Sequence, residues 1–300
     1  MTALSLIGDG IVADRLRRVA APHRVVTRDV DGDVVVVARG GPHAELVAEL
    51  VAAGRHVIST SGSLTDVRQL LDLDRAARDA GVSVVVGAAV SPGLSGMLAR
   101  HLADRLARCD ELHIAVHGTG GPACAREHHA MLSGWAVGWH DGAWLERIPA
   151  GSGRELCWFP EPVGARDCYR AESPDPLVLQ RVFPDVDRIS VRVSAARRDR
   201  LTARLPMLSP PHREGGIGAL RVEARGADAS GARVTLIWGI AELAATAAAA
   251  VAASFVDVVA AGRTEPGVVV AGDAGLPTGD LLAGLGRRGV RLQSFTGLPS

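Results

Sequence analysis

The chain has 300 residues, of which 47% are hydrophobic, enough for one large globular domain or two ordinary ones. Its 33 cationic residues balance its 33 acidic ones, and aromatic residues make up only 3%. We therefore expect no nucleic-acid partner, because there is no excess of positive charge for phosphates and there are few rings to stack on bases. All the cationic residues are arginines, which excludes lysine Schiff bases and P-loops.

The first predicted strand, at residues 4–8, runs into the stretch GDGIVA and a predicted helix that ends near residue 19. In this G-x-G-x-x-A pattern the first glycine permits a tight turn, and the second lets a pyrophosphate approach the backbone. The small third residue lets helix and strand pack closely, and the helix N-terminus faces the phosphates. The residues predicted to bind a dinucleotide here are Gly8, Gly10, Ile11, Val12 and Ala13.

The second and third strands are predicted at residues 25–27 and 33–38. Arg28 could meet the 2′-phosphate of NADP, and Asp29 the 2′-hydroxyl of NAD; we expect NADP, with NAD as the alternative. Parallel neighbours need a crossover of about a dozen residues, and fewer are present. Either the two strands are not parallel neighbours or the second is misplaced, and we expect an open adenosine pocket.

Strands and helices then alternate along the chain. Helices are predicted at residues 43–53, 64–80 and 94 to about 108, and strands at 56–60 and 83–86. This alternation is typical of a parallel α/β sheet of the Rossmann type. We expect the loops after its strands to complete the cofactor site through Ala38, Arg39, Gly40, Ser61, Ser91 and Pro92.

The middle of the chain changes in character. Strands are predicted at residues 112–116, 135–139, 156–159, 188–193, 219–225 and 233–240, the last two as a meander pair. This order predicts an α+β substrate domain with a mostly antiparallel sheet over residues 112–240. We expect residues 1–111 and 241–300 to form the dinucleotide-binding domain. Its C-terminal part is predicted to contain a helix near 240–261, a strand at 268–270, a helix at 279–287 and a strand at 290–294.

The alanine-rich helix is expected to be buried rather than to cross a membrane, because Glu242 and Asp257 interrupt it. The N-terminal residues show no signal-peptide pattern. The four cysteines have no CxxC spacing. We therefore expect a cytoplasmic protein with reduced thiols and no membrane partner.

The stretch VHGTGGPACAREHHAML, residues 116–132, holds the main candidates for acid–base chemistry. A helix would place Cys124 and His128 on one face. His128 is our first candidate for a proton donor because histidine titrates near neutral pH, and Cys124 also lies in the segment. Ordinary packing of these side chains is the alternative. A zinc site with Cys157 or Cys168 is another, but their spacing lacks paired ligands, so we predict no metal.

Residues 151–172 are dense in prolines, aromatics and charges, and suggest a structured loop over a pocket. Arg154 or Arg166 could bind a substrate carboxylate, and Tyr169 is the second candidate acid. An ion-paired surface loop is the alternative. Residues 210–216 could form either a lid or an exposed hairpin loop.

The order of these parts resembles the saccharopine dehydrogenase-like family of NAD(P)-binding oxidoreductases. The resemblance rests on GDGIVA at residues 8–13, SPGLS at 91–95, TGGP at 119–122, and EPGV, LLAGL and GV in the C-terminal return. It implies hydride transfer to an imine, or from an amine, of a small carboxylated metabolite. It also implies a homodimer and places Thr119, Gly120 and Gly121 beside the substrate.

The chain departs from the saccharopine reductases of that family at two positions. It has Ser91 where they carry an aspartate, and Thr119 where they carry a cysteine. These changes argue against saccharopine itself as the substrate. They leave open a different proton donor, a redox-neutral enzyme that uses bound cofactor, or a non-catalytic partner or binding protein.

Overall fold

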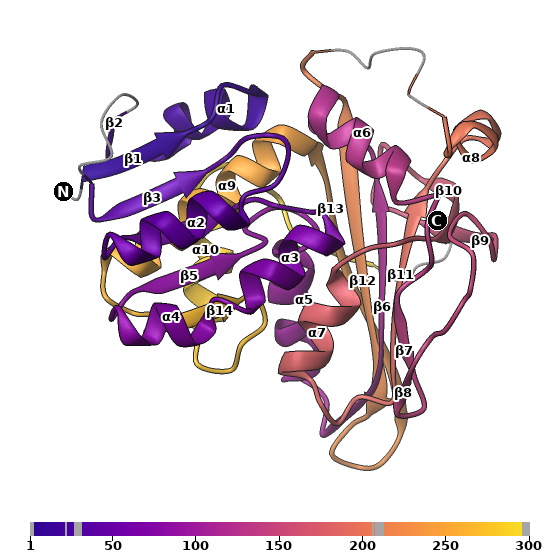
Figure 1. Ribbon diagram of the computed structural model, residues 1–300. Helices are drawn as coiled ribbons and strands as arrows, with labels where there is room; N and C mark the ends of the chain where they lie inside the picture. Colours follow the sequence, from indigo (N-terminus) through magenta and orange to yellow (C-terminus); the bar gives the residue numbers. More distant parts are fainter. Residues whose placement is uncertain (1–2, 22, 27–31, 206, 208–212, 296–300) are drawn as a thin grey trace.

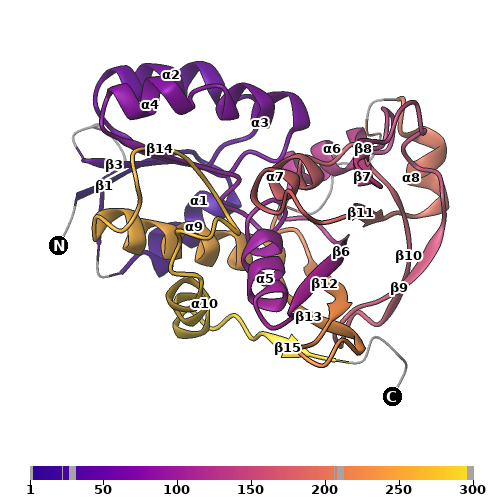
Figure 2. The same ribbon diagram turned by 90° about the horizontal axis from the view of Figure 1, so that it is seen from below.

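The computed structural model describes residues 3–21, 23–26, 32–205, 207 and 213–295. Two sheets stand side by side, with helices on both faces of the first (Figures 1 and 2). The first sheet is entirely parallel, and the second is mixed and mostly antiparallel. The predicted fold class is therefore confirmed.

The first sheet, over the described residues, has six strands in the order β14-β5-β4-β3-β1-β2. They are β1 (Ala3–Ile7), β2 (Arg24–Val26), β3 (Val34–Val37), β4 (His56–Ser59), β5 (Ser83–Val86) and β14 (Gly267–Val270). The residues of β3, β5 and β14 are all buried. Such short, continuous apolar runs are typical of strands covered on both faces.

Strands β2 and β3 lie on opposite sides of β1, both parallel to it. The first alternative from the sequence is therefore correct: these two strands are not neighbours in the sheet. The strand order reverses at β1 and β3. In open α/β sheets such a reversal opens a crevice at the carboxyl ends of the two strands, where ligands bind.

Helices cover the first sheet on both faces (Figure 2). One side carries α2 (Ala44–Ala52), α3 (Leu64–Leu71) and α4 (Asp74–Asp79), and the other carries α1 (Ile11–Val19), α9 (Ala244–Ala260) and α10 (Thr278–Arg287). Helix α9 is buried along nearly its whole length, as predicted. Among the described residues, no helix combines the length and apolarity that a membrane span requires.

The second sheet runs in the order β15-β13-β12-β6-β11-β10-β9, with β7 and β8 beside β11. Its strands are β6 (Arg108–His117), β7 (Gly138–His140), β8 (Ala143–Trp144), β9 (Glu155–Trp158), β10 (Ala165–Arg170), β11 (Arg188–Ser194), β12 (Ile217–Ala227), β13 (Arg233–Leu243) and β15 (Gln293–Ser294). The meander pair β12–β13 is confirmed. Strands β6 and β11 form the parallel pair.

The other four helices of the described residues lie between residues 94 and 202. They are α5 (Leu94–Ala103), α6 (Pro122–Ala130), α7 (Asp175–Val182) and α8 (Arg197–Thr202). Helix α5 packs against β6, β12 and β13 and also against α7 and α10. It therefore lies between the two sheets (Figure 1).

Several predicted elements are wrong in extent. The helix predicted at 64–80 is divided into α3 and α4, where the Asp74 carboxylate accepts a hydrogen bond from the backbone N–H of Val268 in β14, at 2.8 Å. The helix from residue 94 ends at Ala103. Within the region 151–172, β9 corresponds to the strand predicted at 156–159, and β10, which pairs antiparallel with it, was not predicted. In each case tertiary packing overrides the local pattern.

Candidate functional site

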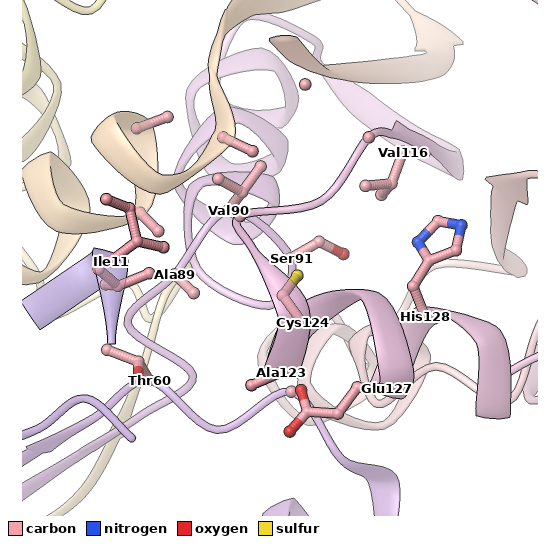
Figure 3. A pocket seen from close by; sticks show the side chains of 18 of the residues that line it. Ile11, Thr60, Ala89, Val90, Ser91, Val116, Ala123, Cys124, Glu127 and His128 are labelled. Atoms are coloured by element: carbon pink, nitrogen blue, oxygen red, sulfur yellow. The ribbon is translucent and has the colours of Figure 1, made fainter. Parts of the chain in front are cut away.

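A cavity of about 560 Å³ lies between the two sheets. One wall is formed by the loops that follow β1, β3, β4 and β5, and the other by α6, the end of β6 and the start of α9. Figure 3 shows Ile11, Thr60 and Ala89 on the first wall and Cys124 and His128 on the second. The cavity therefore occupies the crevice that the strand order predicts.

The first wall depends on a close approach between the turns after β1 and β3. The backbone N–H of Ala38 donates to the carbonyl of Ile7 at 2.8 Å. Gly8 has φ +151°, and a Cβ there would lie 2.0 Å from the carbonyl oxygen of Ala38. Only glycine fits without displacing one of the two turns.

Gly10 is the N-cap residue of α1, and no side chain caps this helix. A Cβ at Gly10 would meet no atom within 4 Å, because the residue faces the open cavity. Helix N-termini whose N–H groups lack a side-chain acceptor bind anionic groups well. The first wall can therefore accept a phosphate on its backbone.

The second wall carries the titratable side chains of α6. Cys124 and His128 project from one side of this helix, toward Val90 and Val116, and Glu127 projects from the opposite side (Figure 3). The predicted sharing of one helical face by Cys124 and His128 is thus seen. The Glu127 carboxylate points toward Gly62, where a Cβ would lie 3.6 Å from its Oε2 atom.

The His128 ring is oriented by the backbone of β11. Its Nε2 atom lies 2.8 Å from the carbonyl oxygen of Ser194, which can only accept, so Nε2 carries the hydrogen. Burial lowers the pKa of His128, so the neutral ring presents a lone pair at Nδ1. The predicted role needs a correction here: neutral His128 accepts a proton, and it donates one only as imidazolium.

Burial shifts the other acid–base groups of this wall toward their neutral forms. It raises the pKa of the Cys124 thiol, although that side chain is exposed to the cavity. Burial and the nearby Asp66 carboxylate raise the pKa of Glu127. His117, whose Nδ1 atom lies 2.7 Å from the Ser194 hydroxyl, has its pKa lowered by burial and by Arg166. These shifts favour the neutral forms of the three side chains, while Arg126, also on α6, brings a positive charge to the cavity.

The loop from β5 to α5 brings Ser91 to the cavity. Gly93, with φ +132°, lets this loop fold tightly, since a Cβ there would lie 2.2 Å from the carbonyl oxygen of Ala89. The Ser91–Pro92 peptide is cis. The Ser91 hydroxyl donates to the Asp175 carboxylate at 2.7 Å. Ser91 therefore joins the cavity to a buried acid.

The structure brings together most of the residues predicted to bind the cofactor. The predicted residues that line the cavity are Gly10, Ile11, Val12, Ala38, Arg39, Gly40, Ser61, Ser91, Gly120, Cys124 and His128. Gly8, Ala13, Pro92 and Gly121 lie directly next to lining residues in the chain. Arg28, predicted to contact the 2′-phosphate, lies outside the described residues, as does Asp29.

Two predicted residues lie at a second cavity, of about 440 Å³, which shares His117 and His128 with the first. They are Arg166 and Thr119. Arg166 is exposed and its guanidinium donates to the Ala165 carbonyl at 3.0 Å. Its position permits contact with a ligand that extends past the two histidines.

Tyr169 and Arg154 line neither of these cavities. The Tyr169 side chain is buried in an apolar cluster with Leu132, and the guanidinium of Arg200 lies 4.0 Å from its ring centroid. Arg154 is paired with Asp167 at 2.9 Å. Their predicted roles as acid and carboxylate ligand are corrected to packing and surface ion pairing.

The zinc alternative finds no support in the positions of the cysteines. Cys157 and Cys168 are buried together in the apolar cluster of β9 and β10, whereas Cys124 faces the cavity. Over the described part of the chain, no three potential ligands gather as a metal site.

The segment considered as a lid is described only from Arg213 onward. There Glu214 pairs with Arg15 of α1 at 3.6 Å. The backbone N–H of Gly216 donates to the Thr119 carbonyl at 3.3 Å. This stretch thus connects the start of β12 to the first wall.

Sequence reasoning missed three acidic residues near the cavity. Glu127 and Glu242 line it, and Asp175 lies behind Ser91. Glu127 is next to the predicted His128 in the chain, so the sequence pointed to this segment but not to Glu127 as a candidate. Nothing local marks Asp175 except the prolines around it, which indicate a helix start.

No family model matches the sequence, and no curated protein matches it. Among solved structures, the chain is similar to apo saccharopine dehydrogenase (L-Glu forming) from Saccharomyces cerevisiae, with a TM-score of 0.70 and 14% identity over 99% of this chain and 100% of that chain. A looser match is a mutant meso-DAPDH with DAP from Clostridium tetani, with a TM-score of 0.49 and 12% identity over 94% of this chain and 96% of that chain. The fold indicated by the order of the motifs is therefore the fold of saccharopine dehydrogenase.

Proposed function

We propose that the protein is a nicotinamide-dinucleotide-dependent oxidoreductase that reduces an imine of a small carboxylated metabolite, or oxidises the corresponding amine. The cavity at the carboxyl ends of β1 and β3, where the strand order reverses, is the observation that carries this proposal. One of its walls is backbone and glycine, suited to phosphates, and the other carries acid–base side chains. The fold shared with saccharopine dehydrogenase supports the same class of activity.

A dinucleotide fits the first wall. Its pyrophosphate would be held by the N–H groups of residues 10–12 at the start of α1, since the space beside Gly10 is open and the helix has no side-chain cap. Ala38, Arg39 and Gly40 would contact a ribose. When bound, the nicotinamide supplies or accepts a hydride.

The side chains of the second wall provide proton chemistry next to that site. Neutral His128 can accept a proton at Nδ1 from the ammonium group of the amine substrate before that amine is oxidised. Arg126 lines the first cavity and Arg166 the second, and either guanidinium can bind a substrate carboxylate.

We propose NADP as the preferred cofactor because Arg28 follows the second strand, where a 2′-phosphate is bound in this type of site. The Arg28→Ala variant is expected to weaken NADPH binding about tenfold or more, the loss of one charged hydrogen-bond partner, with NADH binding nearly unchanged. Equal loss of both affinities would contradict the assignment.

The test of the function is a calorimetric or fluorescence titration of the purified protein with NADPH and NADH. Binding should be followed by oxidation of the bound NADPH when cyclic imino acids are added. Absence of binding to either dinucleotide at millimolar concentration would overturn the proposal. The non-catalytic partner protein considered from the sequence would then take its place.

A further inference from the structure

Asp175, the first residue of α7, is a buried acid whose side-chain hydrogen-bond partners are serines. Its side chain is 1% exposed. Three hydroxyls donate to its carboxylate: Ser95 at 2.5 Å, Ser91 at 2.7 Å and Ser173 at 2.9 Å. A carboxylate in the protein interior is costly unless it is paired with a cation or takes up a proton.

No cation compensates Asp175, which takes part in none of the ion pairs found among the described residues. The arginines of the two helices that surround it are paired elsewhere, Arg100 with Asp104 on α5 and Arg181 with Asp74. Burial raises the pKa of Asp175. The three serine hydroxyls act against this shift, and burial is the larger cause, so the pKa of Asp175 lies above that of an ordinary aspartate.

The three serines differ in what lies on their other side. Ser91 and Ser173 line the cavity, whereas Ser95 is buried on α5 and does not. Asp175 is thus separated from the cavity by one hydroxyl. A serine hydroxyl can accept a hydrogen bond from an acid and donate its own hydrogen onward.

We propose that Asp175 stores a proton that Ser91 delivers to the substrate; this rests on the proposed imine reduction. In the loaded state the protonated Asp175 donates to Ser91 Oγ, and the Ser91 hydroxyl donates to the imine nitrogen. The hydroxyl proton moves to the nitrogen, and the Asp175 proton moves to Ser91 Oγ. The imine carbon gains the hydride from the reduced dinucleotide, and the C=N bond becomes a C–N single bond.

After this step Asp175 is a carboxylate that accepts from all three serines, which is the hydrogen-bond pattern described above. A proton from bulk solvent then returns to Asp175 through the Ser91 hydroxyl, by the same relay. The other acid–base groups are less suited to the task. The Glu127 side chain projects from α6 on the side away from Cys124 and Ser91 (Figure 3). Neutral His128 has no proton at Nδ1 to donate.

The first test needs no substrate. The infrared carbonyl band of a protonated carboxyl group should be present in the wild type at neutral pH and absent from the Asp175→Asn variant. The Glu127→Gln variant controls for the other acid whose pKa is raised in the cavity wall. Loss of the band in Glu127→Gln with none lost in Asp175→Asn would overturn the proposal.

Stability gives a second readout. A group with a raised pKa in the folded state makes the wild type less stable as pH rises above about 3.9, the ordinary aspartate value. Asp175→Asn mimics the protonated acid, so it should remove this slope and unfold at the same or a higher temperature than wild type at pH 7. If Asp175 were instead ionised and stabilised the start of α7, the Asp175→Asn variant would unfold at a lower temperature than wild type.

The third test compares Ser91→Ala with its matched control Ser95→Ala, which removes an equivalent hydrogen bond outside the cavity. NADPH oxidation is followed with Δ1-piperideine-2-carboxylate as the imine. Ser91→Ala is expected to lower kcat by about 100-fold or more, and Ser95→Ala by less than about tenfold.

The outcomes separate the two proposals. Failure of wild type to bind either dinucleotide overturns the oxidoreductase, and with it the delivery step. Wild-type binding and turnover with equal losses in Ser91→Ala and Ser95→Ala overturns the delivery step alone. A large loss in Ser173→Ala without one in Ser91→Ala overturns the route through Ser91.

Discussion

The two walls of the cavity differ in whether backbone or titratable side chains line them. The wall from the parallel sheet consists of the loops after β1, β3, β4 and β5, where backbone and small residues dominate. The wall from α6 and β6 presents Cys124, Glu127, His117 and His128. Backbone geometry determines the shape of the first wall, and the protonation of side chains determines the chemistry of the second.

This difference explains why the first wall is easier to predict from the sequence than the second. A wall of backbone needs glycine at fixed spacing, and glycine at positions 8 and 10 is visible in a stretch of six residues. A wall of side chains depends on how β11, α6 and the Ser91 loop meet, and these segments are far apart in the chain. Changes to the first wall should therefore alter folding and binding, and changes to the second should alter chemistry.

The largest expected effect is at Gly8. Gly8→Ala should lower the free energy of unfolding by about 3 kcal/mol or more, because the new Cβ would lie 2.0 Å from the Ala38 oxygen at an unfavourable φ. The matched control, Gly10→Ala, has open space and an ordinary φ of −85°, so about 1 kcal/mol or less is expected. Denaturant unfolding of both variants measures the difference.

The same pair sharpens the binding role of the first wall. Gly10→Ala should keep the fold but weaken dinucleotide binding, since its methyl group enters the space assigned to the pyrophosphate. Unchanged affinity in a folded Gly10→Ala protein would show that the phosphates lie elsewhere.

On the second wall, His128→Ala is expected to lower kcat for amine oxidation by about 100- to 10,000-fold. His129→Ala is the control, because His129 also meets a carbonyl, that of Thr202 at 2.9 Å, but does not line the main cavity. The wild-type rate should fall as pH drops through the pKa of His128, which burial places below its ordinary value of about 6.5. A rate that rises in acid would contradict the base role.

The smallest effect is expected where the two walls meet. Glu214→Gln removes the charge that pairs with Arg15, but Glu214 is 63% exposed. The free energy of unfolding should change by less than about 1 kcal/mol. A loss of several kcal/mol on denaturant unfolding would show that this contact holds the walls together.

Most of the elements could be predicted because their signals are local. The GDGIVA turn, the valine runs of β3 and β5 and the buried α9 all follow from short patterns. The division between α3 and α4 could not be predicted, because the Asp74 carboxylate at the start of α4 accepts a hydrogen bond from the backbone N–H of Val268, nearly two hundred positions away.

The candidate site was predictable in the same uneven way. The first wall follows from its glycines and from strand ends, and Cys124 and His128 from helical spacing. Asp175 was not predictable, since its role depends on burial and on three hydroxyls, two of them from a distant segment of the chain. Tyr169 was mistaken for a cavity residue because sequence composition does not reveal which face of β10 a ring occupies.

The path of the chain between the two sheets has a further consequence. The described chain passes from one sheet to the other three times, between β5 and β6, β13 and β14, and β14 and β15. Helix α5 contacts elements of both halves at once. A swing about a single hinge would have to bend all three connections together, so the cavity should open by small sliding of packed helices. Heat should melt both sheets in one cooperative transition, with no stable half-molecule left behind.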